Sequence, residues 1–246
     1  AKTGSDAGTA AVRAARAITK RNNIAYWGGG GVWHDWFTVI TSRNEGIPKN
    51  LGKMIKKFEY NNIESLKILF DKWKGEVAAV YMEPMITEFP KKNFLIDVKK
   101  ITKKYGAILI FDEVITGFRF AKGGAQELLK INADISVFGK GIANGMPLAA
   151  ITGKRKYMEK FNDIFYSTTY GGETLSLAAS IAVIDEIKTK PVIKHCWELG
   201  KKLISEFNEL SNQIGVKIKM EGIPVRSKIV CRDDDDNPSV LIKSLF

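Results

Sequence analysis

The sequence contains few cysteines and no long hydrophobic run. Its 246 residues include two cysteines, Cys196 and Cys231, which form neither a CxxC pair nor the Cys/His spacing of a metal site. We therefore expect no metal ion, and we interpret both as buried or inert thiols of a cytoplasmic protein. No apolar run reaches the roughly 18 residues of a membrane-spanning helix, so we expect no membrane association.

Features of a secretory signal and of a complete chain are also missing. The first residues, AKTGSDAGTA, have neither the basic start nor the apolar core of a secretory signal. The chain lacks an initiator Met and stops inside an apolar run, VLIKSLF. These ends predict a fragment of a longer protein, and a removed segment would take any signal with it.

Lysine and arginine outnumber aspartate and glutamate, and the formal net charge is +11. The lysines are spread along the chain, mostly in stretches that resemble amphipathic helices, where solvated outer faces are usual. The pairs are Lys56-Lys57, Lys91-Lys92, Lys99-Lys100, Lys103-Lys104 and Lys201-Lys202. No zinc-finger spacing or RNA-binding aromatic motif accompanies them, so we predict no nucleic-acid partner. The alternative, a basic nucleic-acid-binding module, predicts salt-sensitive binding to DNA or RNA.

Short apolar runs alternate with amphipathic stretches along most of the chain. The expected strands are 24–27, 77–84, 107–113, 135–140 and 148–153, and the expected helices are 5–19, 61–73, 94–105, 174–188 and 191–210. This alternation predicts an α/β protein with a mostly parallel sheet and helices on both faces. In such sheets ligands bind beyond the carboxyl ends of the strands.

The last part of the chain has a different pattern. Residues 218–224 and 226–232 predict strands of a less apolar kind, and Asp233–Asp236 predict a solvated turn. We therefore expect a large domain over residues 1–188 and the start of a smaller α+β domain over residues 189–246.

Lys140 is the first candidate catalytic residue. It follows the predicted strand 135–140 in SVFGKGIANGMP, between Gly139 and Gly141, which leave room for a flat ligand. At the rim of a buried sheet a lysine amine loses its proton more readily and attacks carbonyl groups. The alternative is an exposed lysine in a turn.

Asp112 lies at the end of the apolar run in ILIFDEVITGFR. It precedes Lys140 by 140 − 112 = 28 residues, about one strand–helix–strand repeat. The two side chains are therefore expected to face one crevice. A carboxylate there can pair with a protonated pyridine nitrogen and make the ring an electron sink. Capping of the following segment, or pairing with Arg119, is the structural alternative.

Thr3-Gly4-Ser5-Asp6 opens the first predicted helix. Backbone N–H groups and the dipole at a helix start attract phosphate, although such a run is also an ordinary N-cap. A phosphate cradle, a partner for a ring nitrogen and a Schiff-base lysine together predict one cofactor, pyridoxal 5'-phosphate.

The runs FDEVITGFR and SVFGKGIANGMPLAAITG resemble the class III aminotransferases, a family that includes glutamate-1-semialdehyde aminomutase-like and sugar aminotransferase-like proteins. The resemblance implies fold type I, whose large domain has a mostly parallel sheet of the seven-stranded type. The resemblance implies that Lys140 is the catalytic Schiff-base lysine and that Asp112 is the catalytic partner of the pyridine nitrogen. It implies a transaminase that moves an amino group from an amino donor to a keto or aldehyde acceptor.

The same resemblance implies further cofactor-binding residues. Gly4 and Ser5 match the phosphate-binding pair of the family, and Val114 matches a residue that packs against the ring. Glu83, in MEP, matches a carboxylate near the site. Thr169, in STTYGGET, matches a threonine that reaches the phosphate of the neighbouring subunit's cofactor, which implies a homodimer.

Two other activities stay open at this point. An intramolecular aminomutase of the glutamate-1-semialdehyde type needs the same cofactor and lysine, but STTYGGET differs from the GTxSGNP form associated with it. A catalytically inactive homologue is the second, because the family carries an aromatic-His pair where this chain reads WGGGGVWHDW. Trp27 or Trp33 is expected to replace that aromatic; otherwise the ring loses about 1 kcal/mol of stacking. For His34, a packing role and an acid–base role are both open.

Overall fold

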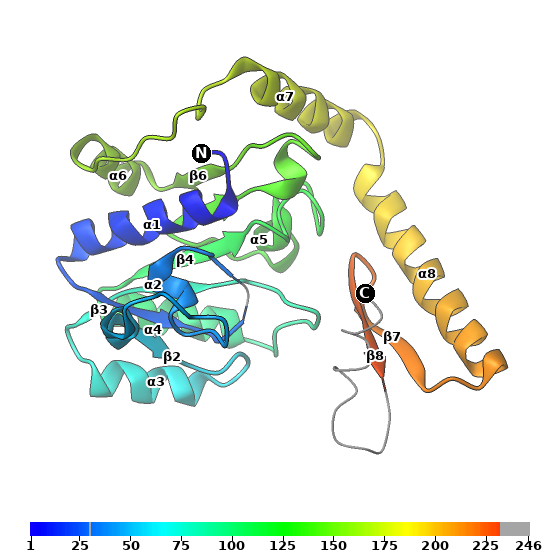
Figure 1. The fold of residues 1–246 in the computed structure, drawn as a ribbon, viewed down its shortest axis with the longest axis horizontal. Coiled ribbons are helices and arrows are strands. Elements are labelled where there is room, and N and C mark those ends of the chain that lie inside the picture. Colours follow the sequence, from blue (N-terminus) through cyan, green and yellow to red (C-terminus); the bar gives the residue numbers. More distant parts are fainter. Residues whose placement is uncertain (30, 232–246) are drawn as a thin grey trace. The chain divides into compact units, whose positions relative to one another are not determined.

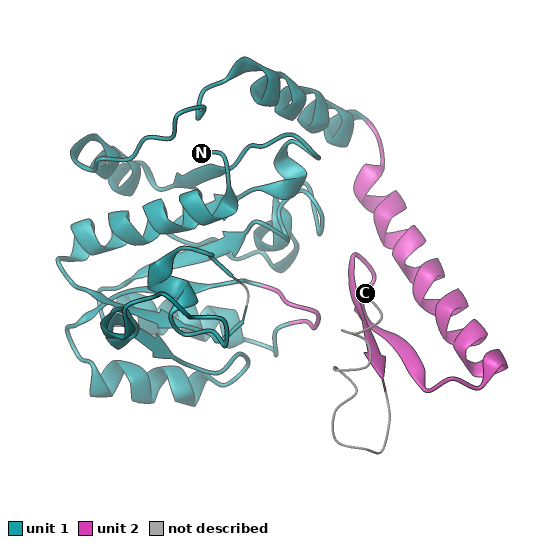
Figure 2. Ribbon diagram, viewed as in Figure 1, with its two compact units in different colours: residues 1–84, 90–189 teal, residues 85–89, 190–246 magenta. Residues whose placement is uncertain are grey.

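A computed structural model describes residues 1–29 and 31–231 of the chain. The predicted turn at Asp233–Asp236 lies outside this part. The chain forms two compact units (Figure 2): one contains residues 1–84 and 90–189, and the other contains residues 85–89 and the chain from Lys190 onward.

The first unit contains a six-stranded sheet with the order β2-β1-β3-β4-β5-β6. The strands are β1 (Asn23–Tyr26), β2 (Ile55–Lys57), β3 (Val77–Met82), β4 (Ile108–Glu113), β5 (Ile135–Phe138) and β6 (Ala150–Gly153). All neighbours pair in parallel except β5 and β6, which are antiparallel. The predicted mostly parallel α/β fold is therefore confirmed (Figure 1).

Helices cover both faces of this sheet, as Figure 1 shows. The helices of this unit are α1 (Gly4–Thr19), α2 (Asp35–Thr38), α3 (Ile63–Lys72), α4 (Phe94–Lys104), α5 (Gly124–Leu129), α6 (Arg155–Met158) and α7 (Thr174–Thr189), with 3-10 turns η1 (Lys49–Met54), η2 (Lys140–Ile142) and η3 (Glu159–Asp163). The alanine-rich face of α1 packs on one side of the sheet, and α3 and α4 pack on the other.

All six residues of strand β4 are buried, because helices cover both faces of the sheet. This burial explains why most of the strand is a continuous apolar run in the sequence. Ile108 and Ile110 belong to the cluster that includes α1, whereas Leu109 and Phe111 belong to the cluster that includes α3 and α4. Alternation then directs Asp112 to the α1 side and Glu113 to the opposite side.

Some elements differ from the sequence predictions. Strand β2 was not predicted, because it is a three-residue edge strand in which Ile55 alone is buried. Strand β3 ends at Met82, two residues before Pro84, whose missing N–H cannot continue a ladder. Strand β5 ends at Phe138, because Lys140 has a φ of 42° and has left the extended conformation.

The second unit contains α8 (Val192–Ile214) and an antiparallel hairpin of β7 (Ile218–Ile223) and β8 (Arg226–Cys231). The side chain of Asn208 on α8 accepts from the backbone N–H of Met220 at 2.8 Å and donates to its carbonyl at 3.0 Å, which joins β7 to the helix. A side chain at Gly200 would lie 2.0 Å from the carbonyl oxygen of Pro224, so the glycine permits this packing. None of the helices within residues 1–29 and 31–231 is long and apolar enough to cross a bilayer.

Candidate active site

Three separate chain segments meet at the carboxyl edge of the sheet. A Cβ atom added to Gly4, in the first turn of α1, would lie 2.7 Å from Cγ2 of Val114, just after β4. A Cβ atom added to Gly139, just after β5, would lie 3.2 Å from Cγ1 of Val114 and 3.8 Å from Cα of Gly4. The start of α1 and the ends of β4 and β5 therefore lie against one another, with Val114 between the two glycines.

Asp112 lies two residues before this contact, near the end of β4, and is 8% exposed. Its Oδ2 accepts a hydrogen bond of 2.6 Å from the hydroxyl of Tyr81 on β3, and its Oδ1 accepts one of 3.0 Å from the backbone N–H of Val114. Burial raises the pKa of Tyr81 well above its usual value, and the Asp112 carboxylate raises it further. The phenol therefore remains a donor, and it fixes the orientation of the carboxylate.

Tyr81 is a candidate site residue that the sequence analysis missed. The signal was a single phenol in the apolar run VAAVYM, because a buried hydroxyl needs a hydrogen-bond partner. The pairing register places Tyr81 opposite Ile110, so Asp112 lies two residues further along on the same face. That register is a tertiary fact, which the sequence does not display.

The neighbouring acid, Glu113, has a different environment. Its carboxylate accepts from the backbone N–H groups of Ala125 and Gln126, both at 2.9 Å, and from the hydroxyl of Thr116. Burial raises the pKa of Glu113, while these hydrogen bonds act in the opposite direction. Glu113 therefore caps the start of α5 on the far side of the sheet and lies outside the site.

Lys140 begins η2 with a φ of 42°, in the left-handed region that side chains rarely adopt. Its flanking glycines are closely packed: a Cβ atom on Gly141 would lie 3.2 Å from the carbonyl oxygen of Gly117, and Gly139 packs on Val114. The side chain of Lys140 is exposed. Backbone strain held by surrounding packing is typical of functional positions.

The first turn of α1 contains hydrogen-bond donors that a ligand could use. Thr3 caps the helix in a reciprocal pair with Asp6: the Thr3 hydroxyl accepts from the Asp6 N–H at 3.1 Å, and Asp6 Oδ2 accepts from the Thr3 N–H at 3.0 Å. Gly4 and Ser5 occupy the next positions, where backbone N–H groups have no acceptor within their own helix. The Ser5 hydroxyl accepts from the backbone N–H of Trp33 at 3.1 Å.

The two candidate tryptophans have different surroundings. Trp27 packs edge-on against Tyr60 with ring centroids 5.5 Å apart and is partly buried against the core cluster that includes α3 and α4. Trp33 is bonded to Ser5 through its backbone, and the residue is 71% exposed. Trp33 is therefore the candidate that lies beside the start of α1 with an available ring.

Both ring nitrogens of His34 contact side chains of α1. Its Nδ1 lies 2.7 Å from the hydroxyl oxygen of Thr9, which also accepts from Nε1 of Trp36 at 2.8 Å. Its Nε2 lies 3.5 Å from Oδ1 of Asp6. These contacts give His34 a packing and positioning role between α1 and α2.

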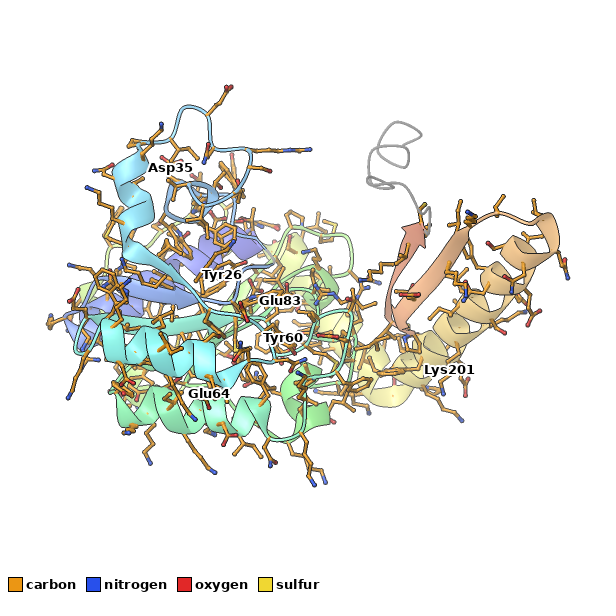
Figure 3. The ribbon with its side chains drawn as sticks, turned by 90° about the horizontal axis from the view of Figure 1, so that it is seen from below. Tyr26, Asp35, Tyr60, Glu64, Glu83 and Lys201 are labelled. Carbon is orange, nitrogen blue, oxygen red and sulfur yellow. The ribbon has the colours of Figure 1, made fainter. Side chains whose placement is uncertain are left out.

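Glu83 directly follows β3 and is 3% exposed. Figure 3 shows it beside Tyr26 and Tyr60. Burial raises the pKa of Tyr26, and the charges of Glu83 and Asp112 raise it further, which places both acids near the end of β1. Thr169 lies exposed in the turn before α7, and within the described chain its side chain bonds to none of the site residues above.

Comparisons with known proteins agree with this geometry. The sequence profile of the family described as aminotransferase class-III matches residues 1–226. A 3-aminobutyryl-CoA aminotransferase from Cloacimonas acidaminovorans (strain Evry) is 34% identical over 241 residues, which are 95% of this chain and 57% of the relative. A glutamate-1-semialdehyde 2,1-aminomutase from Alkaliphilus oremlandii (strain OhILAs) is 36% identical over 251 residues, covering 91% of this chain and 59% of the relative.

Among solved structures, the pyridoxal-phosphate internal aldimine form of the FumI protein from Sphingopyxis sp. MTA144 superposes with a TM-score of 0.87 and 29% sequence identity. The match covers 95% of this chain and 57% of that one, so the chain spans little more than half the length of such relatives. The profile match over residues 1–226 shows that the chain belongs to the class-III aminotransferase family.

Proposed function

We propose that the complete protein is a pyridoxal-phosphate-dependent transaminase that moves an amino group from a small amino donor to a keto or aldehyde acceptor. The observation that carries this proposal is the contact of Gly4, Val114 and Gly139. It brings the first turn of α1, the strand that ends with Asp112 and the turn that begins with Lys140 to one edge of the sheet.

The residues present fit the cofactor. The N–H groups of Gly4 and Ser5 would hold its phosphate at the positive end of α1, and the Ser5 hydroxyl, which accepts from Trp33, still has a proton to donate. The carboxylate of Asp112 would hold the proton on the pyridine nitrogen. Val114, already between the two glycines, would offer its methyl groups to one ring face.

When bound, pyridoxal phosphate withdraws electrons from the carbon that loses its proton. Lys140 would hold the cofactor covalently through its amine, and that amine, once released, would remove the α-proton of the substrate and deliver a proton to the cofactor's C4′ carbon. The constrained backbone at Lys140 supports this role, because a fixed starting point limits the positions that the amine can reach. Glu83 would add a carboxylate near the site, and Trp33 would replace the aromatic that the family places on the ring.

The closest alternative is intramolecular amino transfer of the glutamate-1-semialdehyde 2,1-aminomutase type. It would use the same Lys140 and Asp112, and curated relatives include proteins with this name. The run STTYGGET favours the transaminase. A catalytically inactive homologue is disfavoured, because Tyr81 and Val114 N–H hold Asp112 as a ready acceptor.

We also propose a homodimer in which Thr169 contacts the cofactor of the partner. The helix after Thr169, α7, supports this: its buried positions include Ser176 and Ser180, whereas Leu175 and Ile181 are 64% and 63% exposed. Ile187 is buried near the end of the same helix, but the exposed leucine and isoleucine at its start and middle call for a further apolar surface to cover them.

We further propose that residues 1–188 form the cofactor-binding large domain, truncated at its N-terminal side, and that residues 189–246 begin the small domain. The division of the chain near Lys190 into two compact units supports this boundary. A cytoplasmic location is the corresponding proposal for the cell, and the two free cysteines agree with a reducing compartment.

The test uses the complete protein loaded with pyridoxal phosphate. Borohydride reduction followed by peptide mass analysis is expected to find the cofactor on Lys140 and to find none after Lys140→Ala. Lys130→Ala is the matched control, because Lys130 is also an exposed lysine with a positive φ, 53°, at the end of a helix. Labelling that survives Lys140→Ala would contradict the assignment.

Product analysis then separates the two reactions. A transaminase is expected to convert more than one equivalent of amino donor per active site only when a keto or aldehyde acceptor is supplied, whereas an aminomutase rearranges a semialdehyde repeatedly without one.

A further inference from the structure

A pocket lies at the opposite edge of the sheet from Lys140 and Asp112. It is formed where β1, β2 and β3 begin, and its volume is about 580 Å³. We call it the basic pocket; its charged and aromatic lining consists of Lys20, Arg21, Lys53, Lys56, Trp73 and Glu76. This volume lies within the range of small-ligand sites, about 300–1,000 Å³.

The charges of the basic pocket are unbalanced. Four cationic side chains line it against one carboxylate, that of Glu76, which accepts a hydrogen bond of 3.1 Å from the side chain of Asn23. Within the described residues, none of the four cations forms an ion pair with a carboxylate. The net positive charge is therefore available to a ligand.

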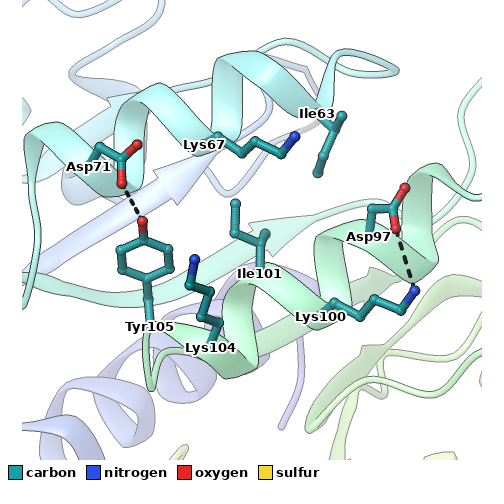
Figure 4. Close-up of a pocket in the computed structure, with 8 residues that line it drawn as sticks. All are labelled: Ile63, Lys67, Asp71, Asp97, Lys100, Ile101, Lys104 and Tyr105. Atoms are coloured by element: carbon teal, nitrogen blue, oxygen red, sulfur yellow. Dashed lines mark hydrogen bonds and ion pairs between the residues drawn. The ribbon is translucent and has the colours of Figure 1, made fainter.

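Another pocket lined by lysines, between α3 and α4, provides a contrast (Figure 4). There Lys100 lies 3.8 Å from Asp97, and Asp71 accepts a hydrogen bond from Tyr105. Lys67 is paired with Glu64 at 2.5 Å. Acids of the same two helices largely balance these lysines, so the pocket between α3 and α4 attracts an anion much more weakly than the basic pocket does.

Two cations of the basic pocket are held in place. Nη1 of Arg21 donates to the carbonyl oxygens of Tyr105 and Val77 at 2.7 and 3.2 Å, and the guanidinium has further N–H donors for a ligand. Nζ of Lys56 lies 3.5 Å from the ring centroid of Trp73 and donates to the carbonyl of Lys53. Such fixed donors lower the entropy that a ligand loses on binding.

Partial burial makes the charge of Lys56 less stable than it would be in water. Burial lowers the pKa of Lys56, Glu76 raises it, and Lys72, which lies outside the lining, lowers it. A bound anion would stabilise the charged form of Lys56.

We propose that the basic pocket binds a compact polyphosphate anion, either pyrophosphate or the phosphate chain of a nucleotide. Several cations around one cavity match a ligand with at least two phosphate groups, because charge-assisted hydrogen bonds to phosphate are strong and add to one another. Trp73 offers an aromatic edge to a nucleotide base. The proposal is independent of the proposed transaminase, since the two sites lie at opposite ends of the strands.

The test uses the complete protein with pyridoxal phosphate bound, so that the phosphate cradle at α1 is occupied. Titration calorimetry with pyrophosphate and with ATP is expected to show binding that weakens as salt is added. The double variant Lys20→Gln/Lys53→Gln is expected to lose affinity by about tenfold or more, because two charge-assisted contacts are removed. Both lysines are exposed, so the fold is expected to be retained.

The matched control is Lys100→Gln/Lys104→Gln in the pocket of Figure 4, which removes the same charge and is expected to leave the affinity unchanged. ATP is expected to bind at least as tightly as pyrophosphate. The proposal is overturned if neither ligand binds at millimolar concentration, or if both double variants lose affinity equally. The single variants Lys20→Gln and Lys53→Gln repeat the measurement should the double variant fail to fold.

Discussion

The hydroxyl of Tyr81 donates a hydrogen bond of 2.6 Å to Oδ2 of Asp112, and this bond joins two neighbouring strands where the candidate site begins. Both groups are buried, so water does not compete for either of them. A carboxylate held in this way keeps its orientation without a ligand, which is the preorganisation that a cofactor site requires.

Tyr81→Phe is therefore expected to weaken pyridoxal-phosphate binding. Loss of a hydrogen bond to a charged group costs about 1.5–3 kcal/mol, or about 10- to 100-fold in affinity. The pKa of Tyr81 is raised above its usual value of 10, so the phenol stays protonated in the folded protein at every pH below 10. The loss of cofactor affinity should therefore be the same from about pH 6 to 9. Equilibrium titration with the cofactor measures it.

Tyr105→Phe is the matched control, because Tyr105 also bonds to an aspartate, Asp71, but on the surface between α3 and α4. An equal loss of cofactor affinity in both variants would show that the Tyr81–Asp112 bond has no special role in the site.

Gly4→Ala is expected to destabilise the protein by about 1–3 kcal/mol, because the new methyl group would overlap the side chain of Val114 at 2.7–2.8 Å. Val114→Ala should relieve the overlap, so the double variant should lose less stability than the sum of the single variants. Urea unfolding measures each free energy. Gly172→Ala, which has no heavy atom within 4 Å of the added Cβ, should change stability by less than about 0.5 kcal/mol.

Glu173 gives a prediction about acid stability. Its bond to Lys2, at 2.6 Å, and its bonds to Ser176 lower its pKa from 4.5 to about 2. A carboxylate with a lowered pKa stabilises the folded state above 4.5 and loses this contribution as pH falls toward about 2. The difference in unfolding free energy between the parent and Glu173→Gln should therefore be constant above pH 4.5 and shrink below it.

Lys2→Gln removes the largest cause of that shift, so it should flatten the same part of the pH profile. If neither variant changes the profile between pH 4.5 and 2, the Lys2–Glu173 pair does not anchor the start of α7 in solution.

Ile181→Asp tests the proposed dimer. Ile181 is 63% exposed on α7, and a buried aspartate at an apolar interface would favour the monomer. Sedimentation of the complete protein is expected to show a dimer for the parent and a larger monomer fraction for the variant. Ile68→Asp on α3, where Ile68 is 67% exposed, should sediment as the parent does. A monomeric parent would contradict the proposal.

Much of the fold could be predicted because it depends on local patterns. The buried strands β3 and β4 appear as continuous apolar runs, and α1 and α4 appear as amphipathic stretches between such runs. Strand β2 could not be predicted, since a three-residue edge strand with one buried side chain has no pattern of its own.

The candidate site was predictable in part. Asp112 and Lys140 follow apolar runs one repeat apart, and residues after consecutive parallel strands must share one edge of the sheet. Asp112 and Glu113 both lie at the end of one strand, and the sequence analysis chose Asp112 from its spacing to Lys140 and from the family resemblance. The role of Glu113 as a cap of α5, on the face of the sheet opposite α1, depends on tertiary packing and could not be predicted.

The amino-acid sequence by itself determined the order of the main strands and helices, the family motifs and the residue types at the strand ends, because these depend on neighbours along the chain. Only the tertiary structure decided that Tyr81 meets Asp112, that Trp33 rather than Trp27 lies beside α1, and that four cationic side chains line one pocket at the far edge of the sheet. These relationships depend on strand register and on contacts between segments far apart in sequence, and no local pattern encodes them.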